Sequence, residues 1–145
     1  MEFDTSAAQI INLYMMLGVL VTGGWSEGAD GDRLDTTEMF LPSTGKTCTL
    51  QRMPKARHGH TLDQLDDGKL LACGGLATSK TCHQFTPSLP HGTWSLYTSS
   101  LVHSRAMHTS LLTEGKLLLL GGDESKNTTE VVGEGESYNL QTMSK

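Results

Sequence analysis

The chain has 145 residues, a length that fits one ordinary domain, and its formal net charge is −5 at pH 7. The basic residues form no cluster, so nothing in the charge pattern favours binding to nucleic acid. No apolar run reaches the ~18 residues that are needed to cross a bilayer, so no membrane span is predicted. The composition, with 16 glycines, 4 prolines and 37% hydrophobic residues, is typical of an all-β chain with many tight turns.

Residues 1–16 are interpreted as an N-terminal extension. The mostly apolar stretch Ile10–Val21 follows acidic residues and no Lys or Arg, whereas a signal peptide would carry positive charge there. Leu17–Val21 therefore predicts a strand, with a degenerate signal peptide as the alternative. Ala7–Met16 has the beginning of a helical pattern, and no other segment of the chain has a convincing helical period.

Three apolar runs along the chain each end in a pair of glycines. The pairs are Gly23-Gly24, Gly74-Gly75 and Gly121-Gly122. Their spacing indicates an internal repeat of about 50 residues. Each run predicts a strand that is apolar throughout because both of its faces are covered, and the two glycines end it where a Cβ would block a close approach.

Other landmarks recur in the same order and define the repeats. Phe40-Leu-Pro42 recurs as Phe85-Thr-Pro87, Thr47-Cys-Thr-Leu50 as Thr93-Trp-Ser-Leu96, and Arg57-His-Gly-His60 as Arg105-Ala-Met-His108. Further strands are predicted near Thr37–Pro42, Thr47–Gln51, His58–Leu65, Cys82–Pro87, Thr93–Thr98 and Met107–Thr113. The repeats are thus assigned to residues 17–68 and 69–115, with a partial third repeat over 116–145.

A four-stranded unit with a Gly-Gly strand, a downstream Trp94 and a later strand preceded by Arg57…His60 or Arg105…His108 resembles the kelch repeat. The resemblance covers roughly residues 17–140 and is closest to the kelch propellers of secreted animal proteins. The segments that carry this closer likeness are Cys48-Thr-Leu, Ala72-Cys-Gly-Gly and Gly92-Thr-Trp.

The resemblance implies an all-β fold of kelch-type β-propeller blades, each with four antiparallel strands, in about two and a half repeats. Cys48 stands where the second repeat has Trp94, and the third repeat is weak after Glu130. Propellers close with about four to eight blades, so this chain is expected to form an incomplete ring. The missing blades are expected from a longer chain or from self-association.

The three cysteines allow at most one disulfide within the chain. Cys73 ends one predicted strand and Cys82 begins the next, so a hairpin would place them opposite each other and a disulfide is predicted. Cys48 is then left for a thiol outside the chain. The alternative is three reduced cysteines in a cytosolic protein. Asn127-Thr-Thr is a sequon for N-glycosylation, which adds to the secreted interpretation.

Six histidines raise the question of a metal site. His58 and His60 share one face of a predicted strand, but no Cys-x-x-Cys or His-x-x-x-His motif accompanies them. His60 and His108 occupy equivalent positions beside equivalent arginines, which predicts hydrogen bonds from blade to blade instead. No metal, cofactor or catalytic residue is therefore predicted. A galactose-oxidase-like copper enzyme would require a tyrosine and histidine set that the sequence does not indicate.

The leading functional hypothesis is a secreted, non-catalytic propeller piece that binds a protein or a glycan through its loops. The candidate loops are Trp25–Asp35, Leu76–Lys80 and Asp123–Asn127. Trp25 is either an exposed binding anchor or a buried core residue. Two alternatives stay open: an intracellular kelch adaptor of the ubiquitin-ligase type that lacks its other domains, and a fragment of a copper oxidase.

Overall fold

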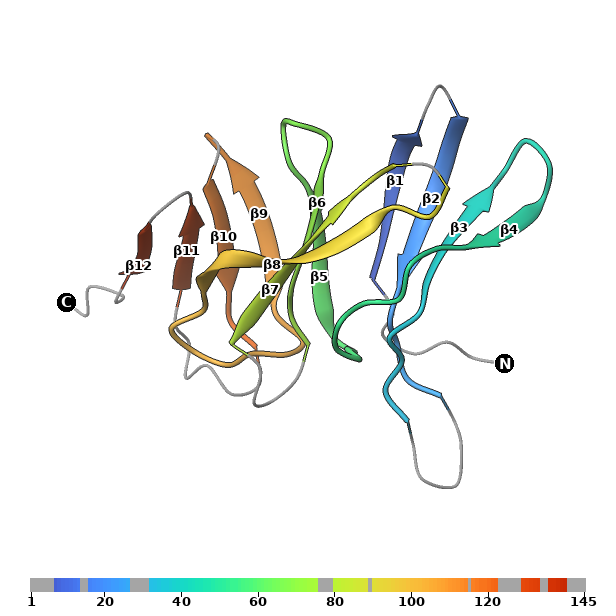
Figure 1. Cartoon of the computed structure of the whole chain (residues 1–145). Helices are drawn as coiled ribbons and strands as arrows, with labels where there is room; N and C mark the ends of the chain where they lie inside the picture. Colours follow the sequence, from blue (N-terminus) through green and yellow to red (C-terminus); the bar gives the residue numbers. More distant parts are fainter. Residues whose placement is uncertain are drawn as a thin grey trace.

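The computed structural model describes residues 7–13, 16–26, 32–75, 80–88, 90–114, 116–122, 129–133 and 136–140. These residues form twelve strands and no helix, so the predicted all-β fold is confirmed (Figure 1). The strands are β1 Ala7–Leu13, β2 Met16–Thr22, β3 Thr37–Leu41, β4 Lys46–Thr49, β5 His60–Gln64, β6 Leu70–Gly74, β7 Thr81–Thr86, β8 Thr93–Ser100, β9 Thr109–Thr113, β10 Lys116–Leu120, β11 Thr129–Gly133 and β12 Glu136–Leu140. In the described part of the chain, no helix has the length and hydropathy that a membrane crossing requires.

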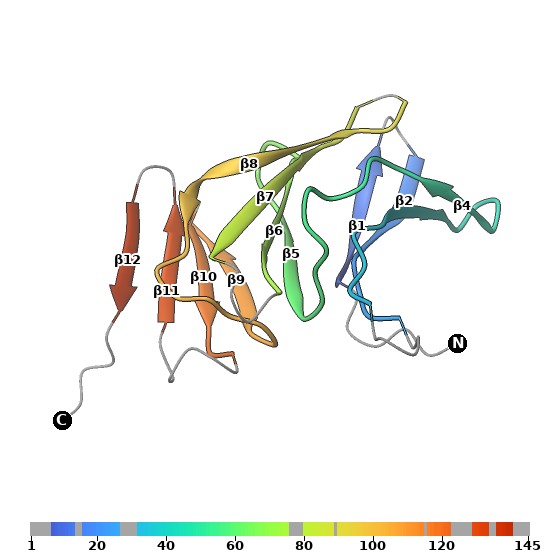
Figure 2. The same cartoon turned by 60° about the horizontal axis from the view of Figure 1, so that its bottom comes forward.

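The strands group into three antiparallel sheets of four, which we call the first (β1–β4), second (β5–β8) and third sheet (β9–β12). Within each sheet every strand pairs with its neighbour in the sequence. The three sheets stand in a row with the second in the middle, and they do not close into a ring (Figures 1 and 2). The opening strands β1, β5 and β9 lie next to one another across the sheets.

The sheets begin one strand earlier than the repeats assigned from the sequence. The Gly-Gly strands β2, β6 and β10 are the second strands of their sheets. The strand that ends each assigned repeat, such as β5 within 17–68, instead opens the next sheet. Ala7–Leu13 forms β1, so the weak helical pattern at Ala7–Met16 does not lead to a helix, and the segment interpreted as an N-terminal extension contains a strand of the first sheet. This strand is what completes three four-stranded sheets.

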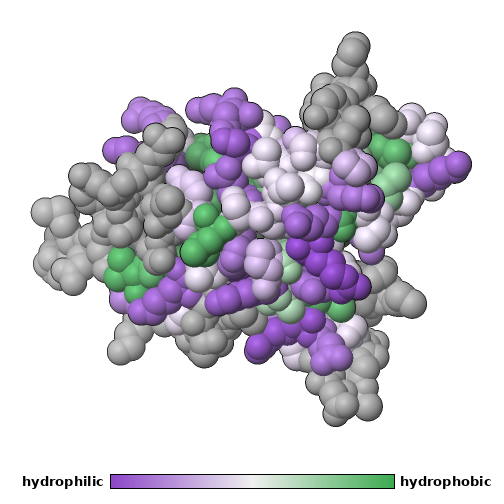
Figure 3. Space-filling view, in the orientation of Figure 1, coloured by the Kyte–Doolittle hydropathy of each residue, from purple (hydrophilic) through white to green (hydrophobic). Residues whose placement is uncertain are grey.

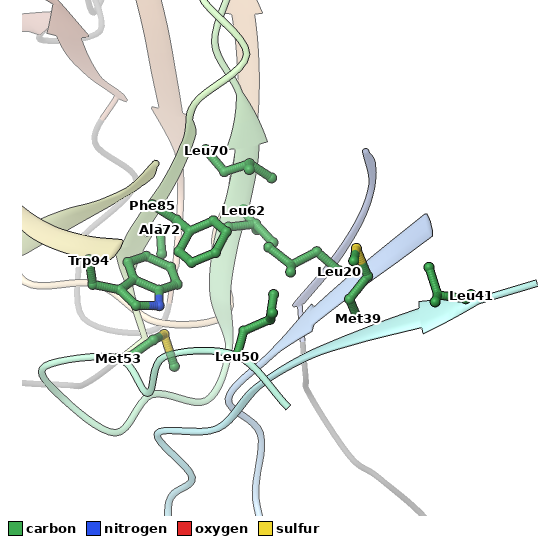
Figure 4. Close-up of a cluster of buried hydrophobic side chains, with 10 residues drawn as sticks. All are labelled: Leu20, Met39, Leu41, Leu50, Met53, Leu62, Leu70, Ala72, Phe85 and Trp94. Carbon is green, nitrogen blue, oxygen red and sulfur yellow. The ribbon is translucent and has the colours of Figure 1, made fainter. Parts of the chain in front are cut away.

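Two apolar clusters hold the row together. The larger one fills the space between the first and second sheets (Figure 4). It consists of Leu20, Met39, Leu41, Leu50, Met53, Leu62, Leu70, Ala72, Phe85 and Trp94. The second cluster joins the second and third sheets through Leu71, Cys73, Cys82, Leu101, Leu117 and Leu119. Alternate residues of β6 thus enter opposite clusters, and all five of its residues are buried.

The two outer Gly-Gly strands are covered on one side only. In β10, Leu117 and Leu119 are buried whereas Leu118 and Leu120 are partly exposed. In β2, Leu17 has 63% of its surface exposed. The expectation that each apolar run is covered on both faces therefore holds for β6 alone, because only the middle sheet has a neighbour on each side. On the face drawn in Figure 3, hydrophobic side chains form separate patches between hydrophilic ones.

The glycine pairs are required by both backbone conformation and space. Gly74 has a φ of +67°, and a Cβ at this position would lie 2.5 Å from the carbonyl oxygen of Arg105. Gly75 has a φ of +84°, and its added Cβ would lie 2.5 Å from the Cβ of His60. Any other residue would therefore push the connecting segments away from the strand end.

Candidate functional site

An arginine side chain crosses the interface between the first and second sheets. Arg57 lies between β4 and β5, is fully buried, and donates a hydrogen bond to the Gly74 carbonyl at the end of β6. It also donates to the carbonyl oxygen (3.0 Å) and the hydroxyl oxygen (2.9 Å) of Thr81 at the start of β7. Its own carbonyl accepts a 2.8 Å hydrogen bond from the N–H of Gly24, which follows β2. Arg57 therefore fastens β6 and β7 to the end of β2.

Arg105 repeats this arrangement at the interface between the second and third sheets. It lies between β8 and β9 and is fully buried. Its guanidinium donates to the carbonyls of Gly121 (2.9 Å) and Leu119 (3.3 Å) on the third sheet. Its carbonyl accepts a 2.9 Å hydrogen bond from Gly75 in the second. The sequence aligns Arg57 with Arg105, but it does not reveal that both are buried and bonded to main-chain carbonyls.

Each repeat histidine bonds to the sheet before it. His60 Nε2 lies 2.8 Å from the Thr22 hydroxyl of β2, and His108 Nε2 lies 3.3 Å from the Thr61 hydroxyl of β5. The position equivalent to Thr22 in the second sheet is Cys73, whose sulfur is bonded to another cysteine. His108 instead meets Thr61, the residue that pairs with Cys73 across β5 and β6. The histidines thus add a polar link at each interface.

The protonation states of His60, His83 and Arg57 agree with the hydrogen bonds that they make. Burial, assisted by the positive charge of Arg57, lowers the pKa of His60 to about 3 and that of His83 to about 4. A guanidinium has no acceptor, so the Nδ1 of His83 that meets Arg57 Nη2 must be unprotonated. Burial lowers the pKa of Arg57 to about 10, which leaves it charged at neutral pH. The interface therefore combines one buried cation with neutral imidazoles.

Trp94 joins the outer parts of the first two sheets. Its side chain is buried beside Phe85, with ring centroids 5.1 Å apart. The indole N–H donates to the Thr37 hydroxyl (3.1 Å) and to the Gln51 carbonyl (3.0 Å). The Gln51 side-chain oxygen in turn accepts from the Trp94 backbone N–H at 2.6 Å. Trp94 is thus a structural contact between sheets rather than an exposed recognition residue.

The predicted disulfide between Cys73 and Cys82 is present, and both cysteines are fully buried. The two residues face each other in the register of β6 and β7. Cys48 is an exposed free cysteine on β4. The predicted glycosylation site Asn127 lies outside the described residues.

A polar contact also links the opening strands of the second and third sheets. The Ser110 hydroxyl on β9 donates a 2.8 Å hydrogen bond to the carboxylate of Asp63 on β5. Burial raises the pKa of Asp63, and its hydrogen bonds with Ser110 and Thr61 act in the opposite direction. The residues of the described part of the chain contain no group of three His, Cys, Asp or Glu side chains placed to hold a metal ion.

Residues from three different connections lie near the ends of the Gly-Gly strands. The rings of Trp25 and His58 pack edge to face with centroids 5.0 Å apart, and both side chains are partly buried. Met107 is 53% exposed and its N–H donates to the carbonyl of Gly59, the residue next to His58. We call Trp25, His58 and Met107 the loop-edge surface. Trp25 is therefore neither fully exposed nor part of the apolar core.

Met107 adopts a backbone conformation that side chains disfavour. Its φ is +54°, and the equivalent residue in the preceding repeat is Gly59, with a φ of +62°. A Cβ added to Gly59 would lie 2.8 Å from the Met107 sulfur, so the two residues pack directly against each other. A positive φ is uncommon for residues other than glycine; in the described part of the chain Glu114, in the turn after β9, also has one. The repeat alignment pairs Met107 with Gly59 but gives no sign of this conformation.

The remaining candidate loops contribute little to a described site. Of Trp25–Asp35, the segment 27–31 lies outside the described residues, as do residues 76–79 and 123–128 of the other two. An open groove of about 490 Å³ lies between the segment after β4 and the β7–β8 connection. Its lining residues are Leu50, Gln51, Ser88, Pro90, His91, Gly92 and Thr93.

Comparison with known proteins identifies the fold. No protein-family model matches the chain, and no curated protein matches it by sequence. The solved structure of a protein called YjhT superposes on 99% of this chain with a TM-score of 0.80 and 15% sequence identity. The chain spans 53% of that structure, or about half its length. This likeness shows that the three sheets have a β-propeller-like fold, without a closed ring.

Proposed function

We propose that this chain is a non-catalytic binding module built from kelch-type propeller blades, and that it binds a protein partner through its loop-edge surface. The observation that carries the proposal is the ring contact of Trp25 with His58, together with the hydrogen bond of Met107 to Gly59, the residue next to His58. These residues come from three separate connections. The backbone N–H groups of His58 and Met107 donate hydrogen bonds to the carbonyls of Gly75 and Gly59, which fixes both residues in place.

The chemistry of the loop-edge surface favours a protein partner. Tryptophan is enriched among the residues that dominate binding energy at protein interfaces, because it offers a large, rigid contact area. The thioether of Met107 adapts its shape to different partner surfaces. Arg57 and Arg105 fix the segments that carry His58 and Met107, so little conformational entropy is lost when a partner binds.

The polar groups that the fold brings together support a non-catalytic role. Inside the interfaces, Arg57 contacts His83 and backbone carbonyls, and His60 contacts the Thr22 hydroxyl, so these groups are shielded from a substrate. Asp63 bonds to Ser110 in the same way. Each of these groups has a structural task, and we assign none of them a chemical step.

We further propose an extracellular location. The buried disulfide between Cys73 and Cys82 is compatible with an oxidising compartment, where such bonds form and persist. The sequon at Asn127 agrees with this location. The intracellular adaptor and the copper oxidase remain alternatives that no specific contact favours.

A capture experiment with matched variants tests the binding proposal. The wild-type chain, the double variant Trp25→Ala/Met107→Ala and the control Leu96→Ala are immobilised and exposed to extracellular fluid from the source organism. Leu96 is 64% exposed on β8 and is not one of the three loop-edge residues. Equal melting temperatures of all three chains establish that each is folded.

We expect a protein that the wild type and Leu96→Ala retain and the double variant loses, and that binds again as a purified component. Retention of the same proteins by all three chains would contradict the proposal. A glycan array run with the same chains covers the other ligand class. Selective glycan binding by the wild type would replace the protein partner with a carbohydrate.

A further inference from the structure

The outer face of the first sheet repeats the acceptor groups that receive Arg57 in the second sheet. The register of β2 with β3 matches that of β6 with β7, since Thr22 pairs with Thr37 as Cys73 pairs with Cys82. The equivalent residues are Gly23 for Gly74, Thr36 for Thr81 and Glu38 for His83. The first sheet therefore carries a carbonyl and a threonine hydroxyl in the same positions, with a carboxylate in place of the imidazole.

No arginine of this chain fills these positions. The sequence contains four arginines, and all four are described: Arg33, Arg52, Arg57 and Arg105. Two of them are buried in the internal interfaces, Arg52 pairs with Asp35, and Arg33 lies in a bridge with Trp25. Among the described residues, the Gly23 carbonyl, the Thr36 hydroxyl and the Glu38 carboxylate have no hydrogen-bond partner.

Apolar residues occupy the strand positions next to the three acceptors, as they do in the second sheet. Val19 and Val21 project on the same face, where the second sheet has Leu70 and Ala72. Phe40 occupies the position of Phe85 and is 40% exposed, whereas Phe85 is fully covered. The outer face of the first sheet thus has the same residue pattern as the face of the second sheet that the first sheet covers. The first sheet stands at one end of the row, and no other sheet of the described chain lies beyond it (Figure 1).

We propose that this outer face is a docking site for another polypeptide that inserts an arginine side chain against the Gly23 carbonyl, the Thr36 hydroxyl and the Glu38 carboxylate. Arg57 shows that a guanidinium fits a strand-end carbonyl and a threonine hydroxyl in these positions, and Arg105 shows that it fits the strand-end carbonyl. Glu38 adds a negative charge that His83 lacks, so the outer site favours a cationic side chain more strongly. The planar fork of arginine matches a carboxylate in two parallel hydrogen bonds, which lysine cannot form.

A peptide probe tests this site independently of the loop-edge surface. The probe is an end-capped peptide with the sequence of residues 101–108, because this segment carries Arg105 into the third sheet. The control peptide has citrulline in place of arginine, which keeps the shape and removes the charge. Amide and side-chain carboxyl resonances of the full chain are followed by NMR during titration with each peptide.

We expect saturable shifts at Thr36 and Glu38 with the arginine peptide, and binding at least about tenfold weaker with citrulline. Glu38→Gln should weaken binding similarly, whereas Glu114→Gln, the same change at an exposed turn of the third sheet, should not. The spectrum of Glu38→Gln before titration shows whether that variant is folded.

Three results would overturn the docking site. The first is no shift at Thr36 and Glu38 with the peptide at millimolar concentration. The second is equal affinity for the arginine and citrulline peptides. The third is dimer formation: light scattering without peptide would give twice the 15.7 kDa mass of the chain, and Val21→Lys would restore the monomer mass. The face would then be a contact between two copies. Loss of loop-edge binding in the capture experiment leaves this site unaffected, so the two proposals fail separately.

Discussion

Replacement of Arg57 by methionine should sharply destabilise the contact between the first two sheets. Methionine keeps an unbranched apolar stem but removes the guanidinium that donates to Gly74, to both oxygens of Thr81 and to His83. Each hydrogen bond from a charged donor contributes about 1.5–3 kcal/mol. Burial of the cation offsets part of this sum, and removal of one partner from a buried charged contact costs about 3–5 kcal/mol. We expect a loss in this range.

Urea unfolding followed by tryptophan fluorescence measures this loss. The control is Arg52→Met, because the Arg52 side chain is 67% exposed and its pair with Asp35 is worth about 0–1 kcal/mol. Arg57→Lys should lie between the two, because an ammonium cannot reach all the acceptors at once. If Arg57→Met fails to fold, Arg105→Met probes the same contact at the other interface. A loss of stability in Arg57→Met no larger than in Arg52→Met would refute the reasoning.

Backbone geometry, acidity and covalent linkage each give a further prediction. Gly59→Ala should lower the free energy of unfolding by at least about 1 kcal/mol more than Gly45→Ala does. Both glycines have positive φ, but only at Gly59 would the added methyl lie 2.8 Å from a methionine sulfur. Equal denaturant midpoints of the two variants would contradict this. The pKa of His60 is about 3 when folded and 6.5 when unfolded, so the unfolded chain takes up the proton first. Stability should be complete above pH 6.5 and fall as the pH is lowered toward 3, with a smaller fall in His60→Gln; parallel pH profiles would refute it. Replacing Cys73 and Cys82 by alanine should cost about 2–3 kcal/mol in urea unfolding, and an unchanged midpoint would show that the link constrains nothing.

The strand positions were predictable because local patterns determine them. The apolar runs that end in Gly74-Gly75 and Gly121-Gly122 become β6 and β10, and the short spacing of Cys73 and Cys82 places them on neighbouring strands. Glycine at a strand end and a hairpin between two cysteines both leave a direct trace in the sequence.

The grouping of strands into sheets was not predictable in the same way. Which strand opens a sheet depends on pairing between distant segments, and the sequence repeat has no fixed starting point. Ala7–Leu13 is apolar enough to begin a helix, and only its register with β2 makes it a strand. The exposure of Leu17 and Leu118 likewise depends on which sheets have neighbours, because both residues belong to runs that resemble the fully buried β6.

The candidate sites depended on side-chain contacts that a repeat alignment does not contain. The alignment places Arg57 beside Arg105, yet their shared acceptors are backbone carbonyls that leave no trace in residue identity. The alignment pairs Met107 with Gly59, but it does not show that Met107 shares the positive φ of that glycine. The acceptor set around Glu38 emerges only when the register of the first sheet is compared with that of the second.

The packing of the first two sheets as neighbouring blades is tested most directly by the indole proton of Trp94. Its N–H donates to the hydroxyl of Thr37 and the carbonyl of Gln51, both outside the second sheet. The predicted result is an indole resonance that exchanges slowly with ²H₂O and shows a nuclear Overhauser effect to the protons of Thr37. If both tryptophan indole protons exchange as fast as free indole and neither lies near Thr37, the two sheets do not pack as described.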